Sequence, residues 1–503
     1  MSFKFLKNIF GKIKQLDGEI DDYKKIVKNP YLPSIAYVNW AMHLAESGDM
    51  EAAEKKLLSS TMMVHKTPEA YINLGVLKTK EKKYEEAIEL FTQALMLDNN
   101  NAKAFCFLGN VFTEIGDYEK AEKNFSNASK IDPHNPDIIT NWGVSLVKQR
   151  KFLPAKEKFE SANKFNNPNF TAIYFLGLIN LELDEIQKAK DKFSILTSII
   201  PDNYEAFYYL AYVLFREGDY EKSLTNALKS LEIYPKKIET YMLISENYMN
   251  LENKEECLKY YELGQKECAI NYYFLISWGI SLQHFEIWEE SKEKFNKAIE
   301  LNEKNDLGFC SLGSSFYRLK DFDNAIENLN KALELNNNNI AALDNLGEIY
   351  LEKNDYQKAI ECFNTILKIS AKAVKAYEKL AKAYAMNNDL KKACKYWQKA
   401  IEYLPNDINT NINYAKFLIE QKDYNQALKK LQNAYKINDK NLDCLNLLFY
   451  TSYTLAKENV SDYNMEKAIK IAEEIEKNYP DKFAYCKEKI ELESKFQQQA
   501  ERQ

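Results

Sequence analysis

A period of 34 residues runs through almost the whole chain and restricts what it can fold into. When repeats are counted from Ser34, twelve further starts follow at steps of 34, with no insertion or deletion before the last repeat. Such a period indicates one supersecondary unit that is stacked many times, because a single unit cannot bury its apolar face alone. The thirteen predicted repeats begin at Ser34, Pro68, Ala102, Pro136, Phe170, Tyr204, Ile238, Tyr272, Asp306, Ile340, Val374, Ile408 and Leu442.

Each repeat places small residues next to large ones at fixed positions. In the first twelve repeats the eighth position is Gly, Ala or Ser, and the twentieth is Ala, Ser or Cys. The seventh position is bulky and apolar, and the twenty-fourth is often aromatic, as at Phe91 and Phe125. Small residues let two helices cross closely while large ones fill the space beside them. Turn signals such as Gly116–Asp117 separate the two halves, so each repeat is predicted to be a hairpin of two helices.

This small–aromatic–alanine–proline pattern resembles that of the tetratricopeptide repeat family. The pattern is nearly complete in Ala102–Asn135, and the resemblance covers residues 34 to about 482. It implies an all-α, right-handed superhelical solenoid of stacked helix hairpins. It also implies that the first helices line the concave side, with positions 2, 5, 6 and 9 facing a bound peptide.

The same 34-residue period predicts where the array begins and ends. Residues 1–33 are expected to form an amphipathic or capping helix, residues 34–482 the solenoid, and residues 483–503 a C-terminal capping helix and tail. The last repeat carries seven extra residues around 457–464, because Ala468 and Pro480 fall seven residues late. Solenoid ends need covering, which favours a capping role for both terminal segments.

Two repeats in the middle of the chain are degenerate in their second helix. The repeats from Tyr204 and Ile238 carry Ala227 and Gly264 where an aromatic residue and alanine are typical. The stability of a solenoid is a sum of local repeat and interface contributions. We therefore expect these two repeats to be the least stable part of the array.

Aromatic residues gather at the positions that the resemblance places in a groove. Tyrosine buries much area at little entropy cost, so a dense exposed set of rings favours a peptide-binding surface. The alternative is that the rings fill the space between neighbouring first helices. The candidate groove residues are Phe107, Tyr174, Phe175, Tyr208, Tyr209 and Tyr212, with Met242, Leu243, Tyr273 and Ile276 in the adjoining repeats.

Nearer the C-terminus the same positions become polar and basic. Tetratricopeptide proteins that hold a partner's C-terminal carboxylate use a set of Lys and Asn residues, which is only partly matched here because Cys310 and Ser314 replace its first two members. A looser site for acidic peptides is predicted, since lysine charges on adjacent repeats add up. A solvated charge run is the alternative. The candidate residues are Asn345, Lys375, Lys379, Lys382 and Asn413.

Composition and motifs argue against several other classes of protein. The net charge of −6 does not indicate nucleic-acid binding, and the sequence shows no phosphate-binding loop, nucleophile elbow or zinc-protease motif. Eight scattered cysteines without a CxxC pair and four separated histidines indicate reduced thiols and no metal site. We therefore expect no catalysis, no cofactor and a cytoplasmic protein.

The predicted function is that of a non-catalytic scaffold or adaptor that binds segments of partner proteins. One alternative is a membrane-surface assembly factor, because residues 1–16 combine an apolar stripe with four lysines and are free of acidic residues. This hypothesis would place the protein at the inner membrane face. Another alternative is a regulatory subunit of a separate enzyme. The sequence leaves open whether the chain associates with itself.

Overall fold

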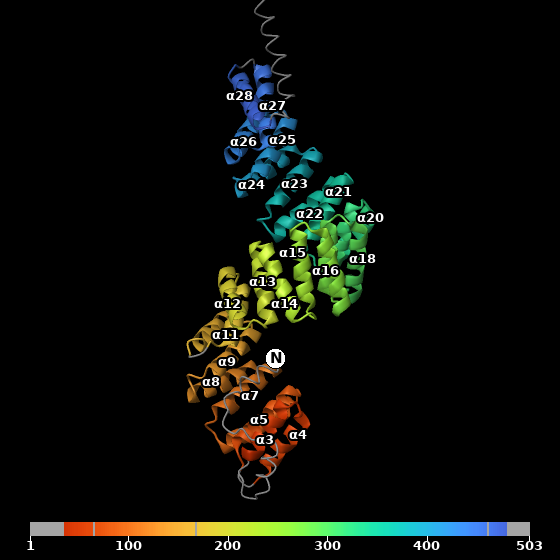
Figure 1. Cartoon of the computed structure of the whole chain (residues 1–503). Coiled ribbons are helices and arrows are strands. Elements are labelled where there is room, and N and C mark those ends of the chain that lie inside the picture. Colours follow the sequence, from red (N-terminus) through yellow and green to blue (C-terminus); the bar gives the residue numbers. More distant parts are fainter. Residues whose placement is uncertain (1–34, 64–65, 166–167, 460–461, 480–503) are drawn as a thin grey trace, which may run out of the picture. The chain divides into compact units, whose positions relative to one another are not determined.

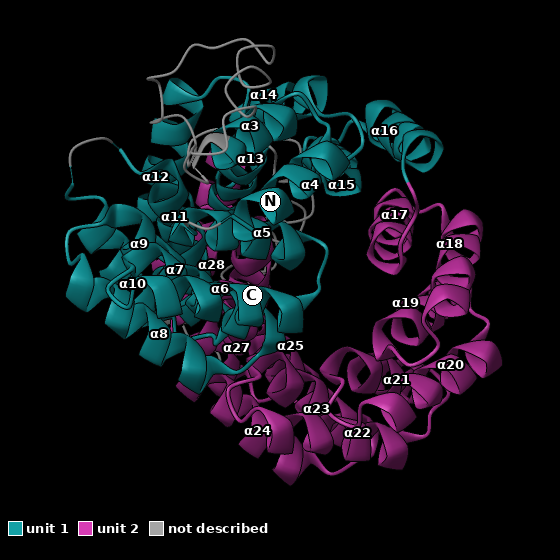
Figure 2. Cartoon of the chain, turned by 90° about the horizontal axis from the view of Figure 1, so that it is seen from below, with its two compact units in different colours: residues 1–268 teal, residues 269–503 magenta. Residues whose placement is uncertain are grey.

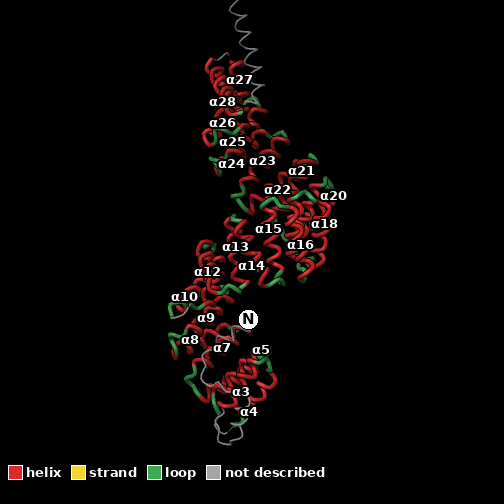
Figure 3. The backbone as a smooth tube through the Cα atoms, viewed as in Figure 1, coloured by secondary structure: helices red, strands yellow, loops and turns green. Residues whose placement is uncertain are grey.

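The computed structural model describes residues 35–63, 66–165, 168–459 and 462–479. Every regular element in these ranges is a helix, from α3 to α28, which confirms the all-α fold (Figures 1 and 3). The predicted terminal helices within 1–33 and 483–503, including the basic segment 1–16, lie outside the described residues. No helix in the described ranges has the length and apolar character required to cross a bilayer.

The first helices of the hairpins are spaced by the 34-residue period. From α5 onward, every first helix begins at the residue that the period gives as a repeat start. The first helices are α3 (Ile35–Glu46), α5 (Pro68–Lys80), α7 (Ala102–Ile115), α9 (Pro136–Lys148), α11 (Phe170–Glu182), α13 (Tyr204–Glu217), α15 (Ile238–Asn250), α17 (Tyr272–His284), α19 (Asp306–Arg318), α21 (Ile340–Glu352), α23 (Val374–Met386), α25 (Ile408–Glu420) and α27 (Leu442–Asn459).

The second helix of each hairpin packs against the first helix that precedes it. The second helices are α4 (Met50–Thr61), α6 (Tyr84–Leu97), α8 (Tyr118–Ile131), α10 (Phe152–Ala162), α12 (Ile186–Ile199), α14 (Tyr220–Ile233), α16 (Lys254–Glu267), α18 (Trp288–Leu301), α20 (Phe322–Leu335), α22 (Tyr356–Ile369), α24 (Leu390–Tyr403), α26 (Tyr424–Ile437) and α28 (Asp462–Asn478). In the last hairpin, α27 has 18 residues whereas α25 has 13, so the extra residues lengthen the first helix and delay the second.

The chain divides into two compact units, coloured separately in Figure 2. Unit 1 ends at Cys268 and contains α3 to α16, and unit 2 begins at Ala269 and contains α17 to α28. The boundary therefore falls at the end of the two repeats that the sequence identifies as degenerate.

Within each unit, successive first helices also contact one another. In unit 1, α5 contacts α7 and α7 contacts α9, and in unit 2, α17 contacts α19 and α19 contacts α21. Figure 2 shows α18, α20, α22 and α24 as the outer row of unit 2, with α17, α19, α21 and α23 inside them. The first helices of unit 2 thus form its inner row, which is the arrangement that the resemblance implies.

The helices of a hairpin cross where the eighth position meets the twenty-fourth. A Cβ atom added to Gly279 or Gly347 would lie 2.4 Å from the ring of Phe295 or Phe363, respectively. Gly75, Gly109, Gly143 and Gly177 face Phe91, Phe125, Phe159 and Phe193 in the same way, and these four rings are completely buried. The predicted pairing of small and large residues at the helix crossing is therefore confirmed.

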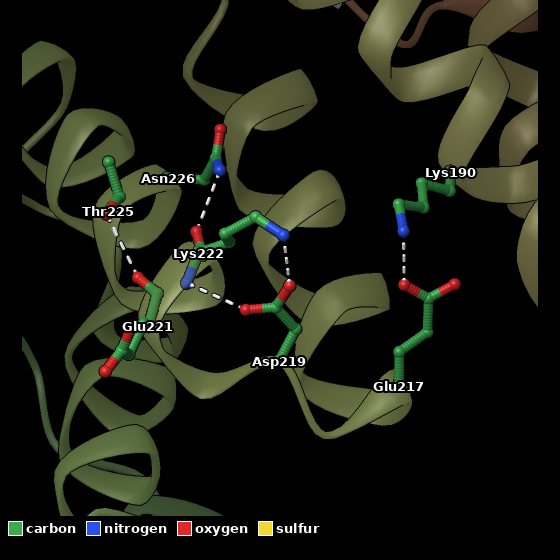
Figure 4. A network of polar contacts seen from close by, with 7 residues as sticks. All are labelled: Lys190, Glu217, Asp219, Glu221, Lys222, Thr225 and Asn226. Atoms are coloured by element: carbon green, nitrogen blue, oxygen red, sulfur yellow. Dashed lines mark hydrogen bonds and ion pairs between the residues drawn. The ribbon is translucent and has the colours of Figure 1, made fainter.

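The turn inside each hairpin has a constant geometry. The fifteenth residue of each of the first twelve repeats adopts a positive φ, and only Gly48, Gly116 and Gly218 among them are glycine. The sixteenth residue is the N-cap of the second helix, and in most repeats its side chain caps that helix, as Asp117 does by accepting a hydrogen bond from the backbone N–H of Lys120. In Figure 4, Asp219 accepts from the backbone N–H of Lys222 at 3.3 Å and pairs with its Nζ at 2.7 Å.

Lys151 offers a direct test of these caps. It occupies the N-cap position of α10, where its side chain accepts no hydrogen bond and its charge opposes the helix dipole. Lys151→Asp should therefore stabilise the α9–α10 hairpin by about 1 kcal/mol, and Asp219→Ala should destabilise α13–α14 by a similar amount. Hydrogen-exchange mass spectrometry on the two hairpins measures both effects. An unchanged exchange rate in both variants would contradict the proposed role of the caps.

Candidate functional site

Three of the predicted groove residues occupy the sixth position and pack between repeats. Each ring stacks on the buried phenylalanine at position 24 of the preceding repeat. The ring centroids are 5.6 Å apart for Phe107 on Phe91, 5.3 Å for Phe175 on Phe159 and 5.3 Å for Tyr209 on Phe193. These half-buried rings therefore join each first helix to the second helix of the preceding hairpin.

Two further tyrosines, at position 5, continue this set of rings across α11 and α13. Tyr174 and Tyr208 meet Tyr209 edge to face, with centroids 5.8 and 5.1 Å away. Burial raises the pKa of both Tyr174 and Tyr208 well above the ordinary value, so their hydroxyl groups stay neutral. The structure thus brings Tyr174, Phe175, Tyr208 and Tyr209 together in unit 1.

A lysine that sequence reasoning missed lies over these rings. Lys237, just before α15, places Nζ 3.8 Å from the ring centroid of Tyr208 and 5.4 Å from that of Tyr209. The ring of Tyr204 is 5.5 Å away. We call Tyr204, Tyr208 and Tyr209 the tyrosine cage. Lys237 is the last residue of its repeat, where no groove position is expected, so its sequence position carried no signal.

A cavity of about 600 Å³ lies along α11 and α13 next to the cage, and Val147 of α9 and Phe152 of α10 complete its lining. Leu178 and Ile179 line it from α11, and Tyr209 and Tyr212 line it from α13. Polar groups of Glu182, Asp184 and Arg216 also line it, and Arg216 pairs with Asp184 at 3.0 Å. Of the residues predicted from sequence, Tyr209 and Tyr212 reach this cavity. Leu178 occupies position 9 and could have been included on the same rule.

The predicted polar residues lie on α21, α23 and α25 of unit 2, where the surface carries both signs of charge. Lys379 pairs with Asp344 at 2.7 Å and with Glu348 at 3.0 Å. Burial opposes its charge, but these two pairs outweigh burial and raise the pKa of Lys379 above the ordinary value. Lys375 and Lys382 are exposed, and Asn345 and Asn413 are half-buried. The expectation that the lysine charges add up therefore does not hold for Lys379, because Asp344 and Glu348 already pair with it.

Lys379 and Lys375 should respond differently to truncation. Lys379→Ala leaves two carboxylates of α21 facing each other without their cation and should destabilise this part of unit 2 by about 1–2 kcal/mol. Lys375→Ala, at an exposed position of the same helix, should change stability by less than about 0.5 kcal/mol. Hydrogen exchange in α21 and α23 compares the two variants, and equal effects would contradict a structural role for the Lys379 ion pairs.

Two residues of the adjoining repeats are not groove residues. Leu243 is 3% exposed and Ile276 is 3% exposed, and each belongs to the hydrophobic core of its own unit. The prediction that they face a groove was wrong, because the first helix in each of these repeats buries its fifth or sixth position. Met242 is half-buried, and Tyr273 is 63% exposed in unit 2.

Of the cysteines that the structure describes, Cys106, Cys257, Cys310 and Cys444 are buried core residues, and the other three are half-buried. Burial raises the pKa of Cys106 to about 12 and that of Cys310 to about 11, which disfavours reactive thiolates. Among the residues that the structure describes, no group of His, Cys, Asp or Glu is arranged to hold a metal ion.

Similarity to solved structures spans much of the chain at low identity. Yeast Tom70 shows 18% identity and a TM-score of 0.45, covering 90% of this chain and 100% of that chain. The APC/C hetero-tetramer Cut9–Hcn1 shows 14% identity and a TM-score of 0.39, covering 86% and 99%. PilF of Pseudomonas aeruginosa shows 20% identity and a TM-score of 0.37, covering 39% and 88%. No curated protein matches the sequence.

Family models identify the repeat itself. Three models, each described as a tetratricopeptide repeat, match residues 78–140, 309–372 and 374–407. The matches fall in both units, and the helix hairpins keep the same 34-residue spacing between and beyond the matched segments. The chain therefore belongs to the tetratricopeptide repeat family.

Proposed function

We propose that this protein is a non-catalytic scaffold that binds an extended segment of a partner protein along α11 and α13 of unit 1. Tetratricopeptide repeat proteins are in general scaffolds for protein interactions. The observation that carries the finer proposal is the cavity of about 600 Å³ that the two first helices line with leucine, isoleucine and tyrosine side chains. A concave apolar site with a few polar groups at its rim is the usual form of a binding pocket.

The cavity lining suggests how such a segment would bind. An apolar side chain of the partner would fill the space between Leu178 and Tyr212, which are both half-buried. The flanking main chain of the partner would hydrogen-bond to the rim, where Glu182 offers acceptors and Arg216 offers donors. Affinity would then come from burial of apolar and aromatic surface, and the polar rim would set the register of the segment.

The polar surface of unit 2 supports a second contact for the same kind of partner. The amide groups of Asn345 and Asn413 can donate to and accept from peptide main chain. The exposed Lys375 and Lys382 would attract acidic side chains, although Asp344 and Glu348 reduce the net charge of this surface. We therefore assign most of the affinity to unit 1.

The experiment begins with crosslinking mass spectrometry on the native complex to identify the partner segment. Tyr212→Ala and Leu178→Ala, tested on that segment by titration calorimetry, should each weaken binding by about tenfold or more. The matched control is Met96→Ala, because Met96 is 72% exposed on the second helix α6 and should leave affinity unchanged. Circular dichroism confirms that each variant is folded.

Two results would overturn this proposal. One is that both cavity variants bind the partner as the unmodified protein does. The other is that crosslinks made with a photoreactive reagent, which does not require the lysines that α11 and α13 lack, map to α8 and α12 while sparing α10, α11 and α13. Loss of binding only on removal of residues 1–16 would instead favour the membrane-surface alternative, which liposome flotation would then test.

A further inference from the structure

The tyrosine cage of unit 1 encloses a positive charge that belongs to the protein itself. Lys237 Nζ lies within 6 Å of three ring centroids, at 3.8, 5.4 and 5.5 Å. These distances are in the range over which an ammonium group is attracted to the face of an aromatic ring. The ring of Tyr234 packs against Tyr204 with centroids 4.7 Å apart and holds one wall of the cage in place.

Glutamates of α13 and α15 act electrostatically on the cage and add to its preference for a cation. Burial lowers the pKa of Lys237 below its ordinary value, while Glu205 and Glu239 act in the opposite direction. Glu239 and Glu246 also act on Tyr208, so negative charge reaches the cage from both α13 and α15. These two helices contact each other and lie side by side in Figure 1. The combination of rings and carboxylates fits an alkylammonium group.

Lys237 occupies the cage from a connector between helices. It lies between α14 and α15, and its backbone carbonyl accepts a hydrogen bond from the backbone N–H of Thr240. Its side chain caps no helix. The ammonium group is carried on a flexible four-carbon stem, so it can leave the rings by side-chain rotation while the backbone keeps its position.

We propose that the tyrosine cage is a receptor for a lysine side chain of the partner segment, and that Lys237 occupies this receptor in the absence of the partner. This inference rests on the proposed function and specifies the chemistry of the ligand. Tyr209 lines both the cage and the 600 Å³ cavity. A partner segment with a lysine close to an apolar residue can therefore engage both at once.

The exchange of one lysine for another has a consequence for selectivity. A partner lysine replaces contacts that Lys237 already makes, so the exchange alone adds little affinity. A segment binds well only when the cavity contributes too, and Lys237 thereby discriminates against isolated cations. Removal of Lys237 should abolish this discrimination.

Tetramethylammonium chloride is a suitable probe because it is a cation without hydrogen-bond donors. Binding is followed by NMR of the protein labelled with ¹³C in its tyrosine rings, with sodium chloride as the control for ionic strength. Lys237→Gln should bind the probe at Tyr208 and Tyr209 at least about tenfold more tightly than the unmodified protein. The double variant Lys237→Gln/Tyr208→Ala should lose that gain. Lys237→Ser repeats the test if the glutamine variant does not fold.

Equal probe binding by the unmodified protein and the Lys237 variants, or no binding by any of them, would overturn the inference. A second comparison uses the partner segment identified by crosslinking, with its lysine replaced by glutamine. If Tyr212→Ala weakens partner binding but the lysine replacement does not, the cage inference fails while the proposed function stands. If the vacated cage binds tetramethylammonium while Tyr212→Ala leaves the partner bound, the proposed function fails instead.

Discussion

Phe193→Ala is expected to destabilise the hairpin of α11 and α12 by about 3–5 kcal/mol, because Phe193 is completely buried at the centre of its core cluster. The ring fills the space beside Gly177, where an added Cβ would lie 2.6 Å away, and it also supports the ring of Tyr209 at 5.3 Å. Removal of the Phe193 ring should therefore open a cavity in the core and, at the same time, loosen the Tyr209 ring that lines the candidate site.

The measurement for Phe193 is hydrogen exchange, since a long repeat array does not unfold in one cooperative step. Exchange in α11, α12 and α13 should accelerate by about a hundredfold or more, while α5 and α7 should change little because repeat stability is local. The control is Ile195→Ala, on the same helix at a 40% exposed position. A uniform acceleration over all of unit 1 would contradict the local picture.

Gly347→Ala has the second largest expected effect, a destabilisation of the α21–α22 hairpin by about 1–3 kcal/mol. The new Cβ would lie 2.4 Å from Cε1 of Phe363, a buried ring that cannot move without disturbing its neighbours. The sign of the net change in stability is informative, because the higher helix propensity of alanine alone would stabilise α21 by about 1 kcal/mol. Hydrogen exchange in α21 and α22 measures the net effect.

A second substitution tests the cause of that destabilisation. The repeat from Ile408 carries Ala415 and Leu431 at the same two positions, and both are completely buried. Gly347→Ala/Phe363→Leu should therefore be more stable than the sum of the two single variants predicts, a coupling that identifies direct contact. Strict additivity of the two changes would show that the helix crossing tolerates the added methyl group by another route.

Much of the fold follows from the sequence because the relevant interactions are local. Asp117 caps α8 by accepting a hydrogen bond from the backbone N–H three residues later, and Gly109 and Phe125, which meet at the crossing, lie in one hairpin. These interactions recur every 34 residues. Each first helix from α5 to α27 therefore begins at the repeat start that the sequence predicts. The longer α27 also agrees with the extra residues inferred from the late Ala468, which is completely buried.

The candidate site was less predictable because its contacts join different repeats. Tyr209 and Tyr212 were placed in a groove by position, yet one ring supports the core and both line a cavity. From its sequence position Lys379 is predicted to be a basic site residue. In the structure it pairs with Asp344, which lies 35 residues earlier in the chain. Sequence position alone does not reveal how far apart two neighbouring hairpins stand.

By itself the sequence determined that the chain forms tetratricopeptide helix hairpins, where most of their helices begin and which small residues meet which rings. These outcomes depend on the spacing of residues within one hairpin, which a periodic pattern records. Only the tertiary structure decided that Lys237 occupies a tyrosine cage, that Lys379 is paired with Asp344 and that Leu243 is buried. Those outcomes depend on the packing of one hairpin on the next, which is set by side-chain volumes and charges from separate repeats.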